Sequence, residues 1–175
     1  MNKYFIKLLI VLVLNTGTTG PIDEYAQNPQ KIFHGKVIAI TDGDTFKLLT
    51  QDSIVHRIRV ASIDCPEKKQ PFSKRAKQFT SDAIFGKNVE VEIQSKDRYG
   101  RIIGKVGYNE SFDLSEELLK HGYAWHYVKY SKDMLLQGLE QEARVKKVGL
   151  WQDKNAIPPW EWRAHKKKKA TKKNK

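Results

Sequence analysis

The sequence contains a single cysteine, Cys65, among its 175 residues. An intramolecular disulfide is therefore excluded, and the fold must depend on a hydrophobic core, which a chain of this length can build as one domain. A lone thiol needs an activating base to act as a nucleophile, and no histidine stands at a suitable spacing from Cys65. Neither His121 nor His126 has a partner at the spacing of a metal site, so the sequence does not favour zinc chemistry either.

Long hydrophobic runs are also scarce. The apolar run at residues 8–14 is too short to cross a bilayer, which needs about 20 such residues. With Lys3 and Lys7 before it and small residues after it, this run predicts that residues 1–20 are a secretory signal peptide. We therefore expect a secreted or periplasmic protein with no membrane span once the leader is removed. An uncleaved interfacial anchor is the alternative.

Charge of one sign dominates only at the ends of the chain. The formal net charge is +12, but seven lysines lie in residues 166–175 and two in the leader, which leaves +3 for residues 21–165. A lysine tail is most often a solvated end and less often an arm that holds a polyanion. The charge alone is therefore weak support for nucleic-acid binding.

The pattern of the remaining chain predicts an α+β fold with a mainly β core. Alternating and β-branched runs predict five strands, over residues 32–40, 45–50, 54–63, 88–94 and 101–108. Helical spacing and capping residues predict three helices, one between Phe72 and Gly86, one between Asp113 and Gly122, and one over residues 132–147. This order of elements is that of a five-stranded Greek-key barrel of the OB type with three helices packed on it.

The chain divides accordingly into five segments. After the leader we expect a linker at residues 21–31 and the barrel domain at residues 32–152. A tryptophan-rich extension at residues 153–165 would pack its tryptophans back on the domain, and a basic tail at residues 166–175 would follow.

The residues best suited to chemistry lie on either side of the second and third predicted strands. Asp42 and Asp44 precede the second strand, and Asp64 and Glu67 follow the third. A hairpin between the two strands would bring Asp44 close to Asp64 and Glu67 at one rim of the sheet. Convergent carboxylates without His or thiol partners suit a hard cation such as Ca²⁺ or Mg²⁺, and nearby arginines suit a phosphate. Metal, arginine and a spare carboxylate are what the cleavage of a phosphodiester needs.

Three motifs of the sequence resemble those of the staphylococcal nuclease (thermonuclease) family: D-G-D-T at residues 42–45, R-V-A-S-I-D-C-P-E at 59–67 and D-R-Y-G-R at 97–101. The resemblance covers residues 33–151, and the motifs occur in the family's order. It implies an endonuclease, a phosphodiester hydrolase that depends on one Ca²⁺ ion, accepts DNA and RNA, and leaves 3′-phosphates. Mg²⁺ would suit the same ligand types. A monomer without a stable protein partner is the default expectation.

The resemblance also implies roles for the matched acids. Asp44 and Asp64 match the direct calcium ligands, and the backbone carbonyl of Cys65 matches a third. Glu67 matches the carboxylate that holds or activates the attacking water. Asp42 matches an acid that lies beside the metal ligands.

Matched basic and aromatic residues would bind the substrate. Arg59 and Arg101 match the two arginines that bind the scissile phosphate. Arg98 and Tyr99 match positions that contact the terminal phosphate and the sugar of the nucleotide. Arg57 shares a strand face with Arg59 but matches no functional position, so we expect it to be structural.

Two features depart from the family's pattern. The loop between Glu67 and the first helix is shorter than in the staphylococcal enzyme, and the family's base-stacking tyrosine has no clean match near Tyr127, Val128 and Tyr130. Two other functions remain open. One is a catalytically inactive OB-fold protein that binds nucleic acid, although such domains usually lose some of the acids or arginines that this chain retains. The other is an envelope-attached adhesion or scaffolding protein that uses the leader and the lysine tail.

Overall fold

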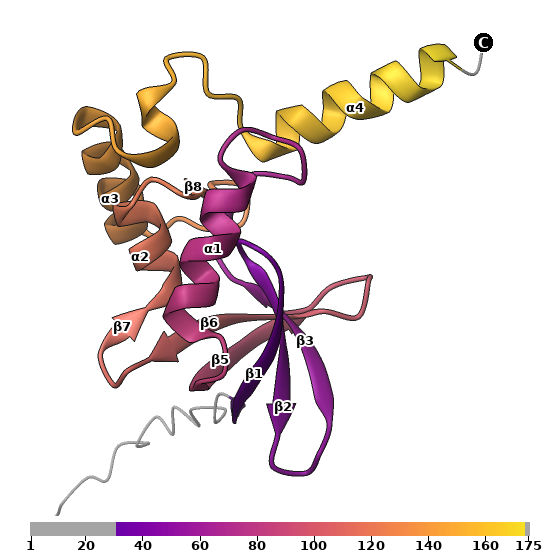
Figure 1. Ribbon diagram of the computed structural model, residues 1–175, viewed down its shortest axis with the longest axis vertical. Coiled ribbons are helices and arrows are strands. Elements are labelled where there is room, and N and C mark those ends of the chain that lie inside the picture. Colours follow the sequence, from indigo (N-terminus) through magenta and orange to yellow (C-terminus); the bar gives the residue numbers. More distant parts are fainter. Residues whose placement is uncertain (1–30, 174–175) are drawn as a thin grey trace, which may run out of the picture.

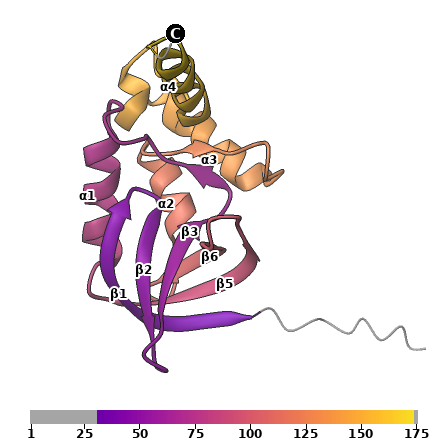
Figure 2. The ribbon, with the colours of Figure 1, turned by 90° about the vertical axis from the view of Figure 1, so that its right-hand side faces the viewer.

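A computed structural model describes residues 31–173, and the predicted signal peptide and nearly all of the predicted linker lie outside this range. The centre of the protein is a closed, mixed five-stranded barrel, with helices along one side and at one end (Figures 1 and 2). The predicted α+β fold of the OB type is therefore confirmed. The barrel strands are β1 (Ile32–Asp42), β2 (Thr45–Thr50), β3 (Val55–Val60), β5 (Asn88–Lys96) and β6 (Ile102–Tyr108).

The barrel closes because its two end strands pair with each other. Neighbouring strands follow the order β3-β2-β1-β5-β6 in antiparallel pairs, and β3 then pairs in parallel with β6. Irregular register in β1, between Val37 and Ala39 and again between Ile40 and Asp42, lets this long strand bend and pair with both β2 and β5. Fully buried side chains fill the interior, among them Val37, Phe46, Leu48, Ile58, Val91 and Val106.

The third predicted strand is broken, which differs from the continuous run expected over residues 54–63. β3 ends at Val60, and Ser62 adopts a left-handed backbone conformation with φ of 65°. The chain then leaves the barrel as β4 (Ile63–Asp64), which pairs with β8 (Trp125–His126). The break turns Asp64 away from the barrel wall and toward its rim.

The three predicted helices are present. α1 (Ser73–Ile84) packs along β1, and α2 (Leu114–Lys120) follows the short β7 (Phe112–Asp113). Asp113 caps α2 by accepting a 3.0 Å hydrogen bond from the backbone N–H of Glu116, as the sequence predicts. α3 (Met134–Val145) is capped in the same way by Asp133, and a single 3₁₀ turn, η1 (Gly149–Gln152), follows it.

A fourth helix, α4 (Pro159–Lys173), was not predicted and runs through both the tryptophan-rich extension and the basic tail. Its proline stands at the first helical position, where a missing N–H costs no hydrogen bond. The helix starts against the body and projects away from it (Figure 1), with the side chains of Lys166, Lys167 and Lys168 exposed. Across residues 31–173, no helix combines the length and the apolar composition needed to cross a membrane.

The extension is anchored by a second apolar cluster beside the main core. Trp125, Ala143, Leu150 and Trp151 are buried together, and Trp160 of α4 packs against them. Trp125 and Trp151 meet edge to face with ring centroids 5.1 Å apart. This cluster fixes the first turn of α4 at the rim of the barrel where β4 and β8 lie.

Candidate active site

The two aspartates predicted as metal ligands meet at the rim of the barrel. Asp44 follows the bend between β1 and β2, and its carboxylate accepts hydrogen bonds from the backbone N–H of Cys65 at 2.8 Å and from the hydroxyl of Thr45 at 3.0 Å. Asp64 lies on β4, and both aspartates are almost completely buried. The hairpin of β2 and β3 therefore brings the two ends of the acidic stretch together, as the sequence predicts.

The bend that carries Asp44 is held by close packing around Gly43. The hydroxyl of Thr80 on α1 donates a 2.6 Å hydrogen bond to the carbonyl of Gly43. A Cβ atom at Gly43 would lie 2.9 Å from the Cβ atoms of Ala76 and Cys65, closer than such atoms approach. Glycine is therefore required here because α1 and Cys65, the residue after β4, both approach the backbone closely.

Arg59 joins the two aspartates. Its guanidinium forms an ion pair with Asp44 and donates to Asp64 Oδ1 at 2.9 Å and to the carbonyl of Ile63 at 3.1 Å. Only 13% of the Arg59 side chain is exposed, so this pairing takes place largely out of water. In the β2–β3 register Arg59 lies opposite Thr45, the residue next to Asp44. From this position one side chain can reach both carboxylates.

A second guanidinium, from Arg163 on α4, completes the cluster and was not predicted from the sequence. It donates to Asp64 Oδ2 at 2.8 Å, to Asp64 Oδ1 at 3.3 Å and to Glu67 Oε1 at 2.7 Å. The sequence offers one indication of this contact. The tryptophans just before Arg163 are expected to pack back on the domain, and such packing would bring the arginine that follows them near the rim.

Arg101 and its neighbours form a separate group on the loop between β5 and β6. Arg101 Nε donates to Asp97 Oδ2 at 2.8 Å, and Asp97 Oδ1 also accepts from the backbone N–H groups of Arg101 and Tyr99, each at 2.9 Å. Arg98 lies over the ring of Tyr99 and donates to its hydroxyl at 2.8 Å. This group faces the same cleft as Asp44 and Asp64 but contacts neither of them.

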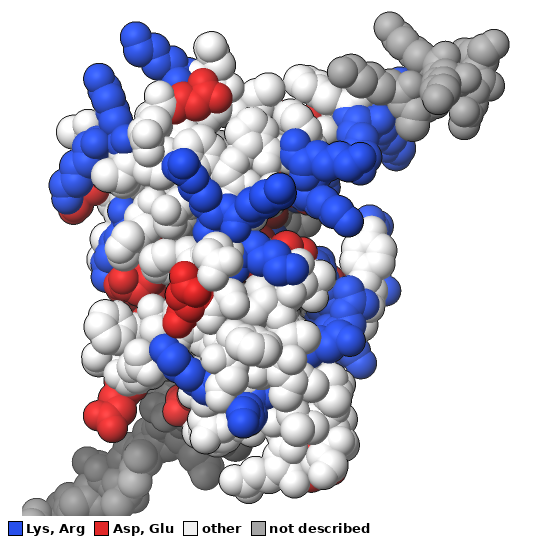
Figure 3. All heavy atoms as spheres, viewed as in Figure 1, with Lys and Arg blue, Asp and Glu red and all other residues white. Residues whose placement is uncertain are grey.

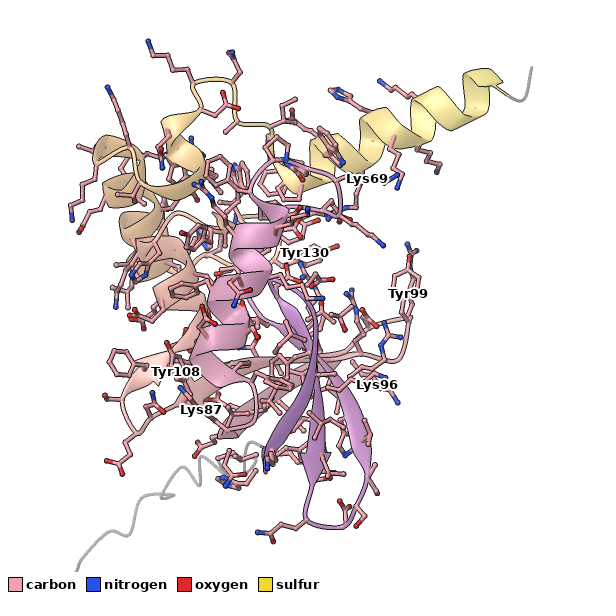
Figure 4. The ribbon with its side chains drawn as sticks, in the orientation of Figure 1. Lys69, Lys87, Lys96, Tyr99, Tyr108 and Tyr130 are labelled. Atoms are coloured by element: carbon pink, nitrogen blue, oxygen red, sulfur yellow. The ribbon has the colours of Figure 1, made fainter. Side chains whose placement is uncertain are left out.

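The cleft between the two groups is large and ringed by basic side chains. It measures about 1880 Å³ and includes all the predicted site residues. Lys and Arg side chains surround a small acidic patch beside α4 (Figure 3), and Figure 4 places Tyr99 across from Lys69 and Tyr130. The basic residues of its wall include Lys68, Lys69, Lys74, Arg98 and Lys129. Such a cleft attracts an extended polyanion.

Burial controls the acidity of the carboxylates. It raises the pKa of Asp42 to about 7, and the adjacent charge of Asp44 adds to the effect. Burial acts in the same direction on Asp44, but the charge and hydrogen bond of Arg59 outweigh it, so the pKa of Asp44 lies below its ordinary value. Burial raises the pKa of Asp64 despite the hydrogen bonds from Arg163.

The Cys65 thiol is unsuited to nucleophilic chemistry. It is buried, and burial together with the charge of Asp44 raises its pKa well above the ordinary value. A thiolate is the reactive form of cysteine, so this environment suppresses it. The part expected of residue 65, through its main-chain carbonyl, does not require this thiol and stays a prediction.

The donor chemistry of the cluster fits a hard cation. Asp44 and Asp64 with a main-chain carbonyl provide oxygen ligands of the kind that Ca²⁺ and Mg²⁺ prefer. Among residues 31–173, however, no three His, Cys, Asp or Glu side chains converge in an arrangement ready to bind a metal. The positive charge beside the two aspartates comes instead from Arg59 and Arg163.

The chain is similar to several known nucleases. The family described as "Staphylococcal nuclease homologue" matches residues 57–153. An "Uncharacterized endonuclease" of Escherichia coli is 40% identical over 76% of this chain and 86% of its own length. The "Micrococcal nuclease" of Shigella flexneri is 38% identical over 75% of this chain and 80% of its own length. The "Staphylococcal-like nuclease CAN1" of Arabidopsis thaliana is 45% identical over 63% of this chain, which corresponds to 34% of the plant protein.

Proposed function

Because the chain belongs to the staphylococcal nuclease family, we propose that it is an exported, Ca²⁺-dependent endonuclease that hydrolyses both DNA and RNA and leaves 3′-phosphates. Its family and its nuclease relatives identify the protein as a phosphodiester hydrolase that acts on nucleic acid. The observation that carries the proposal is the bridge that Arg59 makes between Asp44 and Asp64 on the wall of a basic cleft.

Each residue has a chemical part in this proposal. Asp44, Asp64 and the carbonyl of Cys65 would hold the ion, which when bound stabilises negative charge on the phosphate oxygens. Arg59 is held in place by its two carboxylate partners, and its remaining N–H groups would donate hydrogen bonds to the same phosphate oxygens. Arg101 would approach the phosphate from the opposite side of the cleft, on the loop after β5.

The attack itself needs a base. Glu67 carries a carboxylate that is more exposed than those of the two aspartates, and its backbone N–H donates to Gln70 Oε1 at 2.9 Å, which holds its position in the loop. We assign to it the orientation and deprotonation of a water that attacks phosphorus as the 5′-oxygen leaves. A base of this kind contributes typically 10²- to 10⁴-fold, so loss of Glu67 lowers the rate without removing all activity.

The alternative is an inactive OB-fold protein that binds nucleic acid. Digestion of circular single-stranded DNA separates the two, because a circle is cut only by an endonuclease. We would assay the purified chain without residues 1–20 in Ca²⁺, in chelator and after Ca²⁺ is added back. The proposal expects Ca²⁺-dependent cutting that is lost in Arg59→Ala. Tight binding without cutting in either Ca²⁺ or Mg²⁺ would show that the protein binds nucleic acid but is not a nuclease.

The products and the location need their own measurements. End-labelling of the fragments before and after phosphatase treatment distinguishes 3′-phosphates from 5′-phosphates. Fractionation of the native host cells, with N-terminal sequencing of the recovered protein, tests export. Recovery from washed membranes with the leader intact would instead support an envelope-attached protein.

A further inference from the structure

Arg163 enters the site from outside the region that the family description matches. That match ends at residue 153, whereas Arg163 lies on α4 and still contacts Asp64 and Glu67 through three hydrogen bonds of 2.7–3.3 Å. Its side chain is 41% exposed, compared with 13% for Arg59. Arg163 therefore covers the carboxylates from the solvent side, where a nucleic-acid strand must approach.

The first turn of α4 holds Arg163 in this place. The ring of Trp160 stacks on Tyr127 with centroids 5.2 Å apart and planes inclined by only 2°. Gln70 donates a 2.6 Å hydrogen bond to the carbonyl of Ile157, which ties the loop after Glu67 to the start of the helix. Trp160 and Arg163 are three residues apart and share one helix face. The anchored face of α4 is thus the face that carries Arg163.

The charges of the cluster show what Arg163 can do when a divalent cation is bound. When ionised, the three carboxylates that the arginines contact (Asp44, Asp64 and Glu67) carry three negative charges, and Arg59 and Arg163 carry two positive ones, so these five ion-paired groups sum to −1. A divalent cation on Asp44 and Asp64 changes this to +1, which is the charge that one phosphodiester neutralises. Such a cation would also take the place of Arg163 as the counter-charge of Asp64. A guanidinium fork fits phosphate oxygens as well as it fits a carboxylate.

We propose that Arg163 is a third substrate-binding arginine of this nuclease, one that leaves Asp64 for a phosphate of the bound strand when the divalent cation is present. This inference rests on the proposed function. It gives Arg59 and Arg163 different parts: Arg59 is buried and keeps its carboxylates, whereas Arg163 is exposed and exchanges partners. It also makes α4 part of the active site and not an appendage to it.

The test compares the full chain with its Arg163→Ala, Arg163→Lys and Arg57→Ala variants. Arg57 is an exposed arginine on β3 outside the cleft, so its removal changes the net charge equally without touching the site. Binding of a hydrolysis-resistant phosphorothioate oligonucleotide is measured by fluorescence anisotropy, with Ca²⁺ and with chelator. KM and kcat are measured on a cleavable oligonucleotide, and thermal unfolding checks that each variant is folded.

In Ca²⁺, Arg163→Ala should raise Kd and KM about tenfold, the loss of one charge-assisted pair, while kcat changes less. Arg163→Lys should recover part of the loss, and Arg57→Ala should match the wild type. With chelator the difference between Arg163→Ala and wild type should shrink, because Arg163 then stays on the carboxylates.

Two results would overturn the inference. One is an Arg163→Ala variant whose Kd and KM in Ca²⁺ equal those of the wild type. The other is a loss that is the same with chelator as with Ca²⁺, since a structural counter-ion would behave in that way. Failure of the nuclease proposal looks different, because the wild type itself would bind the oligonucleotide and cut nothing.

Discussion

The backbone N–H of Cys65 donates a 2.8 Å hydrogen bond to the carboxylate of Asp44, 21 residues earlier in the chain. This contact fixes Asp44 against the end of β4, the strand that carries Asp64, and it uses only the main chain of residue 65. The side chain of Cys65 is buried against the bend at Gly43 and takes no part in the contact. This contact therefore depends on where the backbone of residue 65 lies and not on its thiol.

The first prediction concerns this thiol. Cys65→Ala should keep kcat/KM within about threefold of the wild type, because the main-chain N–H and carbonyl remain, and should cost about 1 kcal/mol of stability through lost packing. Steady-state kinetics and urea unfolding measure the two quantities. Thiol reagents should also leave the folded wild type active. A folded Cys65→Ala variant with a hundredfold lower rate would show that the thiol has a chemical role.

The second prediction concerns the bend between β1 and β2. Gly43→Ala should destabilise the protein by about 1–3 kcal/mol, because the added Cβ would lie 2.9 Å from atoms of Ala76 and Cys65 and would force α1 away from the bend. Gly138→Ala is the matched control. Gly138 lies within α3 with open space around it, so alanine there should stabilise the helix by about 0.5–1 kcal/mol. The free energy of unfolding of both variants is measured in urea. A change in the same direction for the two variants would contradict this account.

The bend at Gly43 and the position of Arg163 show how much of the site the sequence predicts. The D-G-D bend, the hairpin and the position of Asp64 near Asp44 follow from local turn signals and from alternation along two adjacent strands. Arg163 lies 99 residues from Asp64, and its placement depends on the stacking of Trp160 on Tyr127. Contacts of that range depend on tertiary packing, which residue spacing does not report.

The break after β3 was missed for a local reason. Apolar residues continue from the strand into β4, so the run over residues 54–63 reads as one strand. The left-handed conformation of Ser62 interrupts it, and serine is an uncommon choice for such a conformation. The helix α4 was missed because its sequence is dominated by lysines with no apolar stripe beyond the first turn. Its beginning is set by packing of Trp160 and its continuation by the helix propensity of lysine and alanine.

The third prediction concerns Arg59. Arg59→Ala leaves two buried carboxylates without their shared partner and should cost about 3 kcal/mol or more, as for other broken buried pairs. Activity should fall at least about 10²-fold with the loss of a phosphate-binding group. Because a divalent cation can replace the missing charge, Ca²⁺ should raise the thermal unfolding midpoint of Arg59→Ala more than that of the wild type. An equal shift in both proteins would mean that the ion does not bind at Asp44 and Asp64.

The fourth prediction concerns pH. His126 is buried, and burial lowers its pKa although the charge of Glu140 acts in the opposite direction. Its Nε2 lies 2.9 Å from the hydroxyl of Ser131, and its Nδ1 has no hydrogen-bond partner among the described residues. The folded protein therefore favours the neutral imidazole more than the unfolded chain does.

It follows that the contribution of His126 to stability is complete above about pH 6.5, the ordinary value for histidine, and is lost as the pH falls toward the lower pKa of the folded state. His126→Gln should reduce the fall in unfolding free energy between pH 7.5 and pH 5.5. Parallel profiles for wild type and His126→Gln would contradict the assignment.

The fifth prediction links the aromatic anchor of α4 to the chemistry of the cleft. Trp160→Ala removes the stack on Tyr127 and frees the first turn of α4, so Arg163 should lose its fixed position without being changed itself. Oligonucleotide affinity in Ca²⁺ should then fall by a factor similar to that of Arg163→Ala. Trp160→Phe, which keeps an aromatic ring, should retain most of the affinity.

The double variant tests whether the two residues act as one unit. If Trp160 works by holding Arg163, the combined loss in Trp160→Ala with Arg163→Ala should be close to that of either single variant, which is the non-additivity expected of coupled positions. Anisotropy titrations of the four proteins in Ca²⁺ give the coupling directly. Losses that multiply would show that Trp160 and Arg163 affect binding independently, and α4 would then contribute to the cleft through its basic surface instead of through one positioned guanidinium.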